Sequence, residues 1–126
     1  MSGQSLIDLR MPLYFHPLYT DGIAPDARFP RDRYRRLKER LSQGEALELL
    51  RIEEAPSAER DDLLIAHEPE YVARFLDASM DRAERRRIGL RPWTPLLIPR
   101  TLHLMGGALS ALKHVAQHGG IAGNMA

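Results

Sequence analysis

The chain has 126 residues, 44% of them hydrophobic, and its 18 basic residues nearly balance 17 acidic ones. This length fits one soluble globular domain, and the absence of cysteine excludes disulfide scaffolds, cysteine-ligated zinc fingers and thiol nucleophiles. A formal net charge of +1 gives no overall field that would attract nucleic acid or an anionic membrane. No apolar run reaches the roughly 18 residues of a membrane span, and no signal peptide is visible. We therefore expect a cytoplasmic protein with no nucleic-acid or membrane partner.

The first third of the chain alternates short extended runs with a helical pattern. The apolar residues 13–15 predict a strand that ends before or at Pro17, and residues 20–30 predict a loop rich in glycine, proline and aspartate. Residues 31–43 predict a helix, which ends at the following glycine. Residues 47–52 favour a second short strand.

Two linked helices are expected next. Ser57 is the predicted N-cap of the first helix, which runs to about His67. Pro69 opens the second, which turns Val72 and Phe75 toward the core together with Tyr71 and Leu76. A charged stretch and a loop with the only tryptophan follow, over 81–87 and 88–95.

The longest periodic segment is a predicted helix over 98–118. Its apolar residues recur at alternating spacings of four and three and form a single stripe: Ile98, Leu102, Met105, Leu109, Leu112 and Ala116. Gly106 and Gly107 each cost about 1 kcal/mol relative to alanine, which predicts a close approach to a neighbouring backbone. Residues 121–126 favour the start of a buried strand. The order of elements indicates an α/β protein with parallel strands and crossover helices.

The histidines do not complete a catalytic or metal site. His114 and His118 stand at the spacing that lets two imidazoles on one helix share a metal, but no acidic residue joins them. At about 100° per residue, these two and His103 lie opposite the apolar stripe, so we expect a solvated polar face. His67 is expected to cap or pack at a helix junction, whereas His16, near the end of the first strand, is better placed for function.

Six segments share their order and spacing with one known family. They are HPLY at 16–19, FPRDRY at 29–34, APSAERDDLLIAHEPEYVARF at 55–75, IGLRPWTP at 88–95, the glycine pair at 106–107 and GIAGNMA at 120–126. In these segments the chain resembles the N-terminal part of the histone deacetylase and acetylpolyamine amidohydrolase family, in particular its bacterial, class IV-like branch.

The resemblance implies an α/β, arginase/deacetylase-like three-layer fold with a parallel sheet. Residues 1–126 would be its incomplete N-terminal segment, cut inside the strand that precedes the family's His-His motif. The full-length protein would then be a zinc-dependent deacetylase that cleaves acetyl-lysine, acetylpolyamine or related small amides. Zn²⁺ is expected for that protein, whereas this segment is expected to hold no catalytic residue and no metal ligand, and to be inactive alone.

The resemblance assigns roles to three residues of this chain. Arg33 would lie beside an internal channel below the active site and hold leaving acetate or water, although a surface arginine is the other interpretation. Trp93 and Thr94 would lie in the loop that forms the rim of the substrate tunnel, although Trp93 also fits a core-packing role.

A non-catalytic function is the alternative to the deacetylase interpretation. The chain would then be an α/β or helical protein-interaction module that uses the basic helix over 31–43 or the amphipathic helix over 98–118. We also expect that the isolated chain exposes sheet edges and apolar helix faces meant for missing strands, which would lead to a homo-oligomer, a swapped assembly or aggregation.

Overall fold

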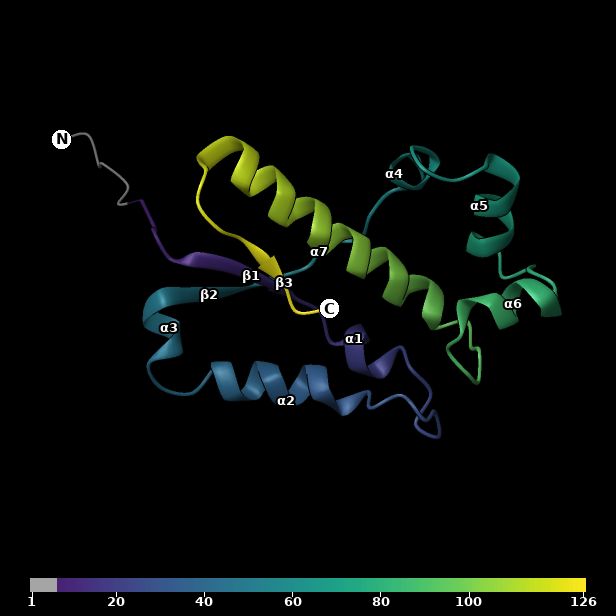
Figure 1. The fold of residues 1–126 in the computed structure, drawn as a ribbon, viewed down its shortest axis with the longest axis horizontal. Coiled ribbons are helices and arrows are strands. Elements are labelled where there is room, and N and C mark those ends of the chain that lie inside the picture. The colour runs from purple at the N-terminus through teal and green to yellow at the C-terminus, as the bar shows by residue number, and fades with distance from the viewer. Residues whose placement is uncertain (1–6) are drawn as a thin grey trace.

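A three-stranded parallel sheet is the centre of the computed structural model, which describes residues 7–126 (Figure 1). The central strand β1 (Met11–Phe15) pairs with β2 (Leu50–Glu54) on one edge and with β3 (Gly123–Asn124) on the other. The register places Leu13 opposite both Ile52 and Gly123. The predicted α/β class with a parallel sheet is confirmed.

Helices lie on both faces of this sheet (Figure 1). Because successive side chains leave a strand on opposite faces, Phe15 faces α2 (Asp32–Leu41), where the ammonium of Lys38 lies 5.9 Å from its ring centroid. The next residue, His16, stacks on His103 of α7 (Leu97–His118). The helices of the described residues are α1 (Leu18–Asp21), α2 (Asp32–Leu41), α3 (Ala46–Leu49), α4 (Arg60–Leu64), α5 (Pro69–Leu76), α6 (Arg82–Ile88) and α7 (Leu97–His118).

The core forms where the carboxyl end of β1 meets α1, α2 and the start of α7. Its buried members are Phe15, Tyr19, Ile23, Tyr34, Ala55 and Leu97. α1 occupies the start of the predicted loop over 20–30, so that prediction is wrong for its first residues. The short helix forms because Asp21 and Gly22 donate backbone hydrogen bonds to Pro17 and Leu18, and it buries Tyr19 and Thr20.

The second strand and the helix after it begin later than predicted. Residues 46–49 form a helical turn, and β2 starts at Leu50 because its pairing with Met11 fixes the register. Ser57 is not the N-cap of α4. The cap is Glu59, whose backbone N–H donates to the Asp62 carboxylate over 2.9 Å, as in a capping box. The predicted start at Pro69 and the burial of Val72 and Phe75 are confirmed.

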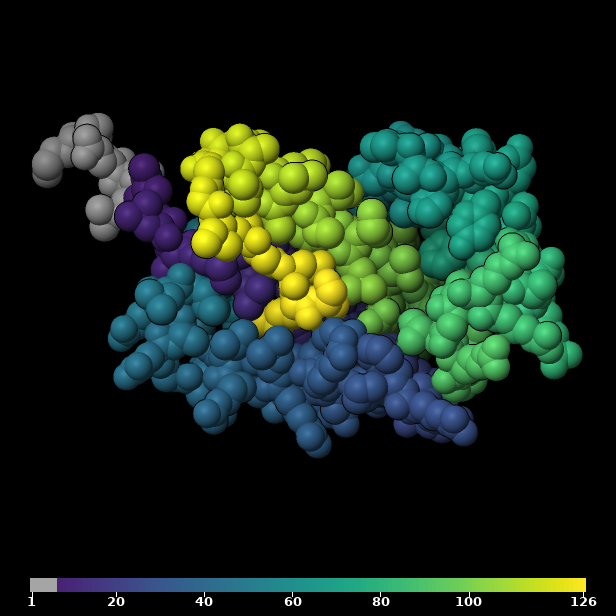
Figure 2. Space-filling model, in the orientation of Figure 1, coloured from purple at the N-terminus to yellow at the C-terminus, as the bar shows by residue number. Residues whose placement is uncertain are grey.

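The apolar stripe of α7 faces away from the sheet. The packed side of the helix carries Leu97, Arg100, Leu104 and Gly107, on average about 140° around the axis from the stripe. Along the stripe, Met105 is 37% exposed and Leu112 is 66% exposed. The C-terminal half of α7 lies on the surface in the space-filling view (Figure 2). Within residues 7–126, no helix is both long and apolar enough to cross a bilayer.

The two glycines of α7 permit the predicted close approach. A Cβ on Gly106 would overlap the carbonyl group of Pro56, and the neighbouring Ala58 N–H donates to the carbonyl oxygen of Leu102 over 2.9 Å. A Cβ on Gly107 would lie 2.7 Å from the Tyr19 hydroxyl and 2.8 Å from Oδ1 of Asn124. The segment after β2 therefore lies against one side of α7, and α1 and β3 lie against another.

Candidate functional site at the carboxyl ends of the strands

The carboxyl ends of the three parallel strands meet at one edge of the sheet. β1 ends at Phe15, β2 at Glu54 and β3 at Asn124. In open α/β sheets, ligands bind in the crevice outside this edge. The polar side chains at this edge, and those just below it, are therefore the candidate functional residues.

A buried tyrosine joins the first helix to the third strand. Tyr19 has no exposed surface, and its hydroxyl donates to Oδ1 of Asn124 over 2.7 Å while lying 3.2 Å from the carbonyl oxygen of His103. The Asn124 amide in turn donates to the carbonyl oxygen of Leu104 over 3.0 Å. Burial raises the pKa of Tyr19 to about 12, partly offset by the Asn124 hydrogen bond and the charge of Arg100. The phenol is therefore neutral at physiological pH.

Two arginines surround the hydroxyl of Tyr34 in α2. Nη2 of Arg33 donates to this oxygen over 3.2 Å, and its guanidinium lies 4.8 Å from the ring centroid of Phe29. Nη2 of Arg100 in α7 reaches the same oxygen at 3.5 Å, and its Nε donates to the carbonyl oxygen of Tyr19. Arg33 is itself exposed on α2, and its guanidinium lies against the rings of Phe29 and Tyr34.

Arg100 carries a buried positive charge that no carboxylate offsets. Its exposure is 6%, and none of the ion pairs within residues 7–126 involves it. Burial lowers its pKa, and the aromatic hydroxyls of Tyr34 and Tyr19 counteract this shift. A buried charge without a counter-ion is costly, which makes this cluster attractive to a small anion.

Trp93 and Thr94 lie half-buried in the loop between α6 and α7. The Trp93 ring packs against the core cluster on one side, and the guanidinium of Arg85 lies 4.4 Å from its ring centroid. Its Nε1 is buried without a hydrogen-bond partner among residues 7–126. The Thr94 carbonyl accepts from Leu97 N–H at the start of α7. Arg33 lies beside Phe29 and Tyr34, and Trp93 packs against the same core cluster.

The histidines of α7 differ from the predicted solvated face. His103 is half-buried, stacks on His16 with ring centroids 3.6 Å apart, and places Nδ1 2.9 Å from the carbonyl oxygen of Ala55. His114 is half-buried, whereas His118 is exposed as predicted. Their ring centroids lie 4.9 Å apart, but residues 7–126 contain no group of three or more side chains placed to hold a metal ion.

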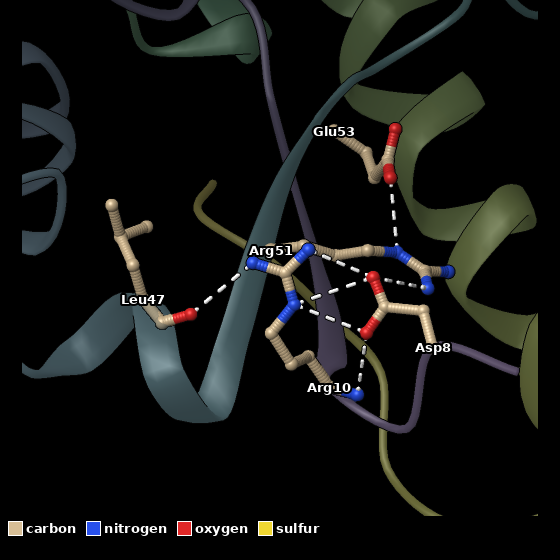
Figure 3. A network of polar contacts seen from close by, with 5 residues as sticks. All are labelled: Asp8, Arg10, Leu47, Arg51 and Glu53. Atoms are coloured by element: carbon tan, nitrogen blue, oxygen red, sulfur yellow. Dashed lines mark hydrogen bonds and ion pairs between the residues drawn. The ribbon is translucent and has the colours of Figure 1, made fainter. Parts of the chain in front are cut away.

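A second polar network lies at the opposite, amino ends of β1 and β2 (Figure 3). The Asp8 carboxylate accepts from Nη2 of Arg10 over 2.8 Å and lies 3.7 Å from Nη1 of Arg51. Nε of Arg51 in turn pairs with Glu53 at 2.9 Å. The Arg10 hydrogen bonds lower the pKa of Asp8. Opposite charges are balanced within this network, so it leaves no uncompensated charge for a ligand.

Sequence reasoning missed Tyr19, Arg100 and Asn124 as members of the site. Arg100 carried one usable signal, because it stands three residues after Leu97 and four before Leu104, on a helix face that is otherwise apolar or small. An arginine at such a position is buried or reaches a specific partner. Tyr19 and Asn124 gave no signal, because their contact joins residues that are 105 positions apart.

Comparison with known proteins gives one informative relative. No family model matches the chain. The chain is 30% identical over 108 residues to an uncharacterized protein of Picosynechococcus sp., and the match covers 86% of this chain. It covers 36% of that relative, so the chain spans about a third of the length of the protein it matches.

Proposed function

We propose that this chain is the N-terminal segment of a zinc-dependent, deacetylase-like hydrolase with an arginase/deacetylase-like three-layer fold. The buried, uncompensated charge of Arg100 beside Arg33 is the observation that carries the proposal. The segment supplies scaffold, part of the tunnel rim and the internal channel. The length of the relative supports this view, since about two thirds of that protein lies outside the match.

The arginine cluster suits the product side of an amide deacetylation. Hydrolysis of an acetylated amine releases acetate, a small anion, and guanidinium groups bind carboxylates in a bidentate geometry. Arg33 and Arg100 approach the Tyr34 hydroxyl from two different helices, so an anion between them would satisfy both charges. This role extends the internal-channel assignment of Arg33 to Arg100.

Zinc does not fit the residues described here. Residues 7–126 hold no group of three candidate ligands, and the His114–His118 pair lacks a third member. When bound elsewhere in a longer protein, zinc would polarise the amide carbonyl and activate a water molecule. The proposed substrates are acetyl-lysine, acetylpolyamine or related small amides, with Trp93 and Thr94 beside their entrance.

The proposal is tested on the whole protein encoded by the gene. Its reading frame is inspected after Ala126 for the Gly-Gly-x-His-His motif and the later Asp, His and Asp ligands. The protein is then expressed and assayed with acetyl-lysine peptides and acetylpolyamines, with and without Zn²⁺. Zinc-dependent release of acetate is the expected result. A frame without these ligands, or a zinc-loaded protein that releases no acetate, overturns the proposal.

Matched arginine variants test the channel role. R33M and R100M are each expected to lower turnover and to weaken inhibition by added acetate. R35M serves as the control, because Arg35 lies on the same helix but pairs with Asp32 at 2.7 Å on the surface. Unchanged acetate inhibition in R33M and R100M would remove Arg33 and Arg100 from the channel, and the assignment to the hydrolase class would then rest on the reading frame and the substrate assay alone.

A protein-interaction role is the second candidate, and the outward stripe of α7 favours it. Met105 and Leu112 are exposed on the same side of this helix, where their burial by another chain would be favourable. We propose a second copy of the chain as the occupant when the segment is produced alone, since β3 also leaves one strand edge unpaired. Light scattering tests this candidate, and a monodisperse monomer at high concentration would exclude it.

A further inference from the structure

Two stacked imidazoles connect the end of β1 to α7, apart from the arginine cluster. The rings of His16 and His103 lie 3.6 Å apart between centroids, and their planes differ by 17°. His16 follows β1 directly, and His103 is near the middle of α7. The pair joins two segments that the chain separates by more than 80 residues, at the edge of the sheet where the strands end.

The hydrogen bonds fix where each ring carries its proton. Nδ1 of His103 lies 2.9 Å from the carbonyl oxygen of Ala55, which can only accept, so Nδ1 of His103 carries a proton. Nδ1 of His16 accepts the backbone N–H of Leu18 over 3.0 Å, so it carries none. The proton of neutral His16 is therefore on Nε2, which lies 3.7 Å from Oε1 of Glu54.

Protonation of His16 conflicts with its hydrogen bond from Leu18 and with its stacking on His103. A proton on Nδ1 would point at the Leu18 N–H, so the hydrogen bond at the first residue of α1 would be lost. The positive charge would also lie against the face of His103. Glu54 from β2 is the one acidic group paired with His16 among residues 7–126, and its side chain is 80% exposed, which leaves its attraction screened by water.

We propose that the His16–His103 stack is an acid-sensitive latch that holds α1 and the carboxyl end of β1 against α7. At neutral pH the ring of His16 is uncharged and stacks on that of His103. In acid, Nδ1 of His16 takes up a proton and no longer accepts the backbone N–H of Leu18. The charged ring then separates from His103. The element that loosens is α1, which carries Tyr19 and Thr20 in the core.

The direction of the pH effect follows from the state that binds more protons. Burial and the neighbouring His103 lower the pKa of His16 below its ordinary 6.5, with Glu54 opposing the shift. The unfolded chain therefore takes up a proton before the folded chain does. The stability from neutral His16 is fully present above about pH 6.5 and is lost as pH falls through this value toward the folded pKa.

Hydrogen exchange of the Leu18 amide tests the latch in the intact chain. After correction for intrinsic exchange, protection of Leu18 is expected to fall between pH 7 and pH 5. H16N keeps a side-chain acceptor near Leu18 but cannot titrate, so its protection is expected to be the same at both values. H118N, changed at an exposed histidine of α7, is the control and is expected to behave as the unaltered chain.

Two outcomes overturn the proposal. One is Leu18 protection that is equal at pH 7 and pH 5 in the unaltered chain, and the other is an H16N variant that still loses protection in acid. Histidine titration by NMR gives a measurement that needs no variant. The pKa of His16 is expected below the ordinary histidine value of 6.5, and a pKa at or above that value would contradict the latch. None of these readouts depends on hydrolase activity, so they are independent of the proposed function.

Discussion

The hydroxyl of Tyr19 in α1 lies 2.7 Å from Oδ1 of Asn124 in β3, and Gly107 of α7 leaves the space in which they meet. This contact ties the first helix to the last strand across a sequence separation of 105 residues. Since the phenol is fully buried, its hydroxyl has no water to replace a lost partner.

Substituting Tyr19 with phenylalanine is expected to destabilise the chain by roughly 0.5–1.5 kcal/mol, because the half-buried Asn124 loses its hydrogen-bond donor. Urea unfolding measures the change. Y71F, at a half-buried tyrosine of α5, is the control and is expected to cost less. Equal losses in the two variants would show that the contact contributes little.

Gly106→Ala is expected to destabilise the chain, opposite to the usual effect in a helix. Alanine ordinarily gains about 1 kcal/mol over glycine at an interior helical position. Here the added Cβ would overlap the carbonyl group of Pro56. This group belongs to the backbone, so it cannot move without shifting the chain around it. Thermal or urea unfolding measures the sign. K113A, on the exposed surface of α7, is expected to change stability by no more than about 0.5 kcal/mol. A stabilised G106A variant would contradict the close approach.

The neighbouring aspartates of α4 provide a matched pair for its N-cap. Asp62 accepts the Glu59 N–H, whereas Asp61 stands beside it in the same first turn without this bond. Asp62→Ala is expected to cost about 1 kcal/mol more than Asp61→Ala, because both lose the same charge at the helix N-terminus but only one loses the cap. Chemical denaturation of the two variants gives the difference, and identical midpoints would refute the cap.

A charge placed in the outward stripe of α7 is expected to reduce self-association without unfolding the chain. Leu112 is 66% exposed, so Leu112→Glu removes little buried contact within the chain and disfavours an apolar interface. Light scattering and circular dichroism measure the two effects. K113E changes charge at the adjacent exposed residue and is expected to leave association nearly unchanged. A marked loss of helicity in L112E would show that Leu112 belongs to the core.

Local signals in the sequence predicted part of the fold well. An apolar run predicted the strand at 13–15, and the preference of proline for the first helical position predicted the start of α5 at Pro69. The cost of glycine in a helix predicted the close contacts of Gly106 and Gly107. β2 begins later than the predicted strand over 47–52, because its pairing with β1, a non-local interaction, fixes its start at Leu50. Ser57 is a good N-cap by residue type, but the segment after β2 continues extended against α7 until Glu59.

The main error was the prediction that the side of α7 opposite its apolar stripe is solvated, because this side packs and carries part of the candidate site. Counting apolar residues selects the stripe of Met105 and Leu112, whereas the sheet packs against a side with arginine, histidine and glycine. Polar residues occupy that side because specific partners exist for them, namely Tyr34 for Arg100 and His16 for His103. Such partners come from distant parts of the chain, so periodicity alone does not reveal them.

The adjacent glycines of α7 also fix the rotation of the helix about its own axis. Successive residues point about 100° apart around a helix, so Gly106 and Gly107 contact different segments, one near Pro56 and the other at Tyr19 and Asn124. Rotating α7 about its axis in either sense would drive a neighbouring side chain into one of these contacts. Rotation of α7 therefore cannot bury the apolar stripe against the sheet. Only a partner chain that binds from outside can shield the stripe from water, and the contacts of the two glycines determine the direction in which the stripe faces.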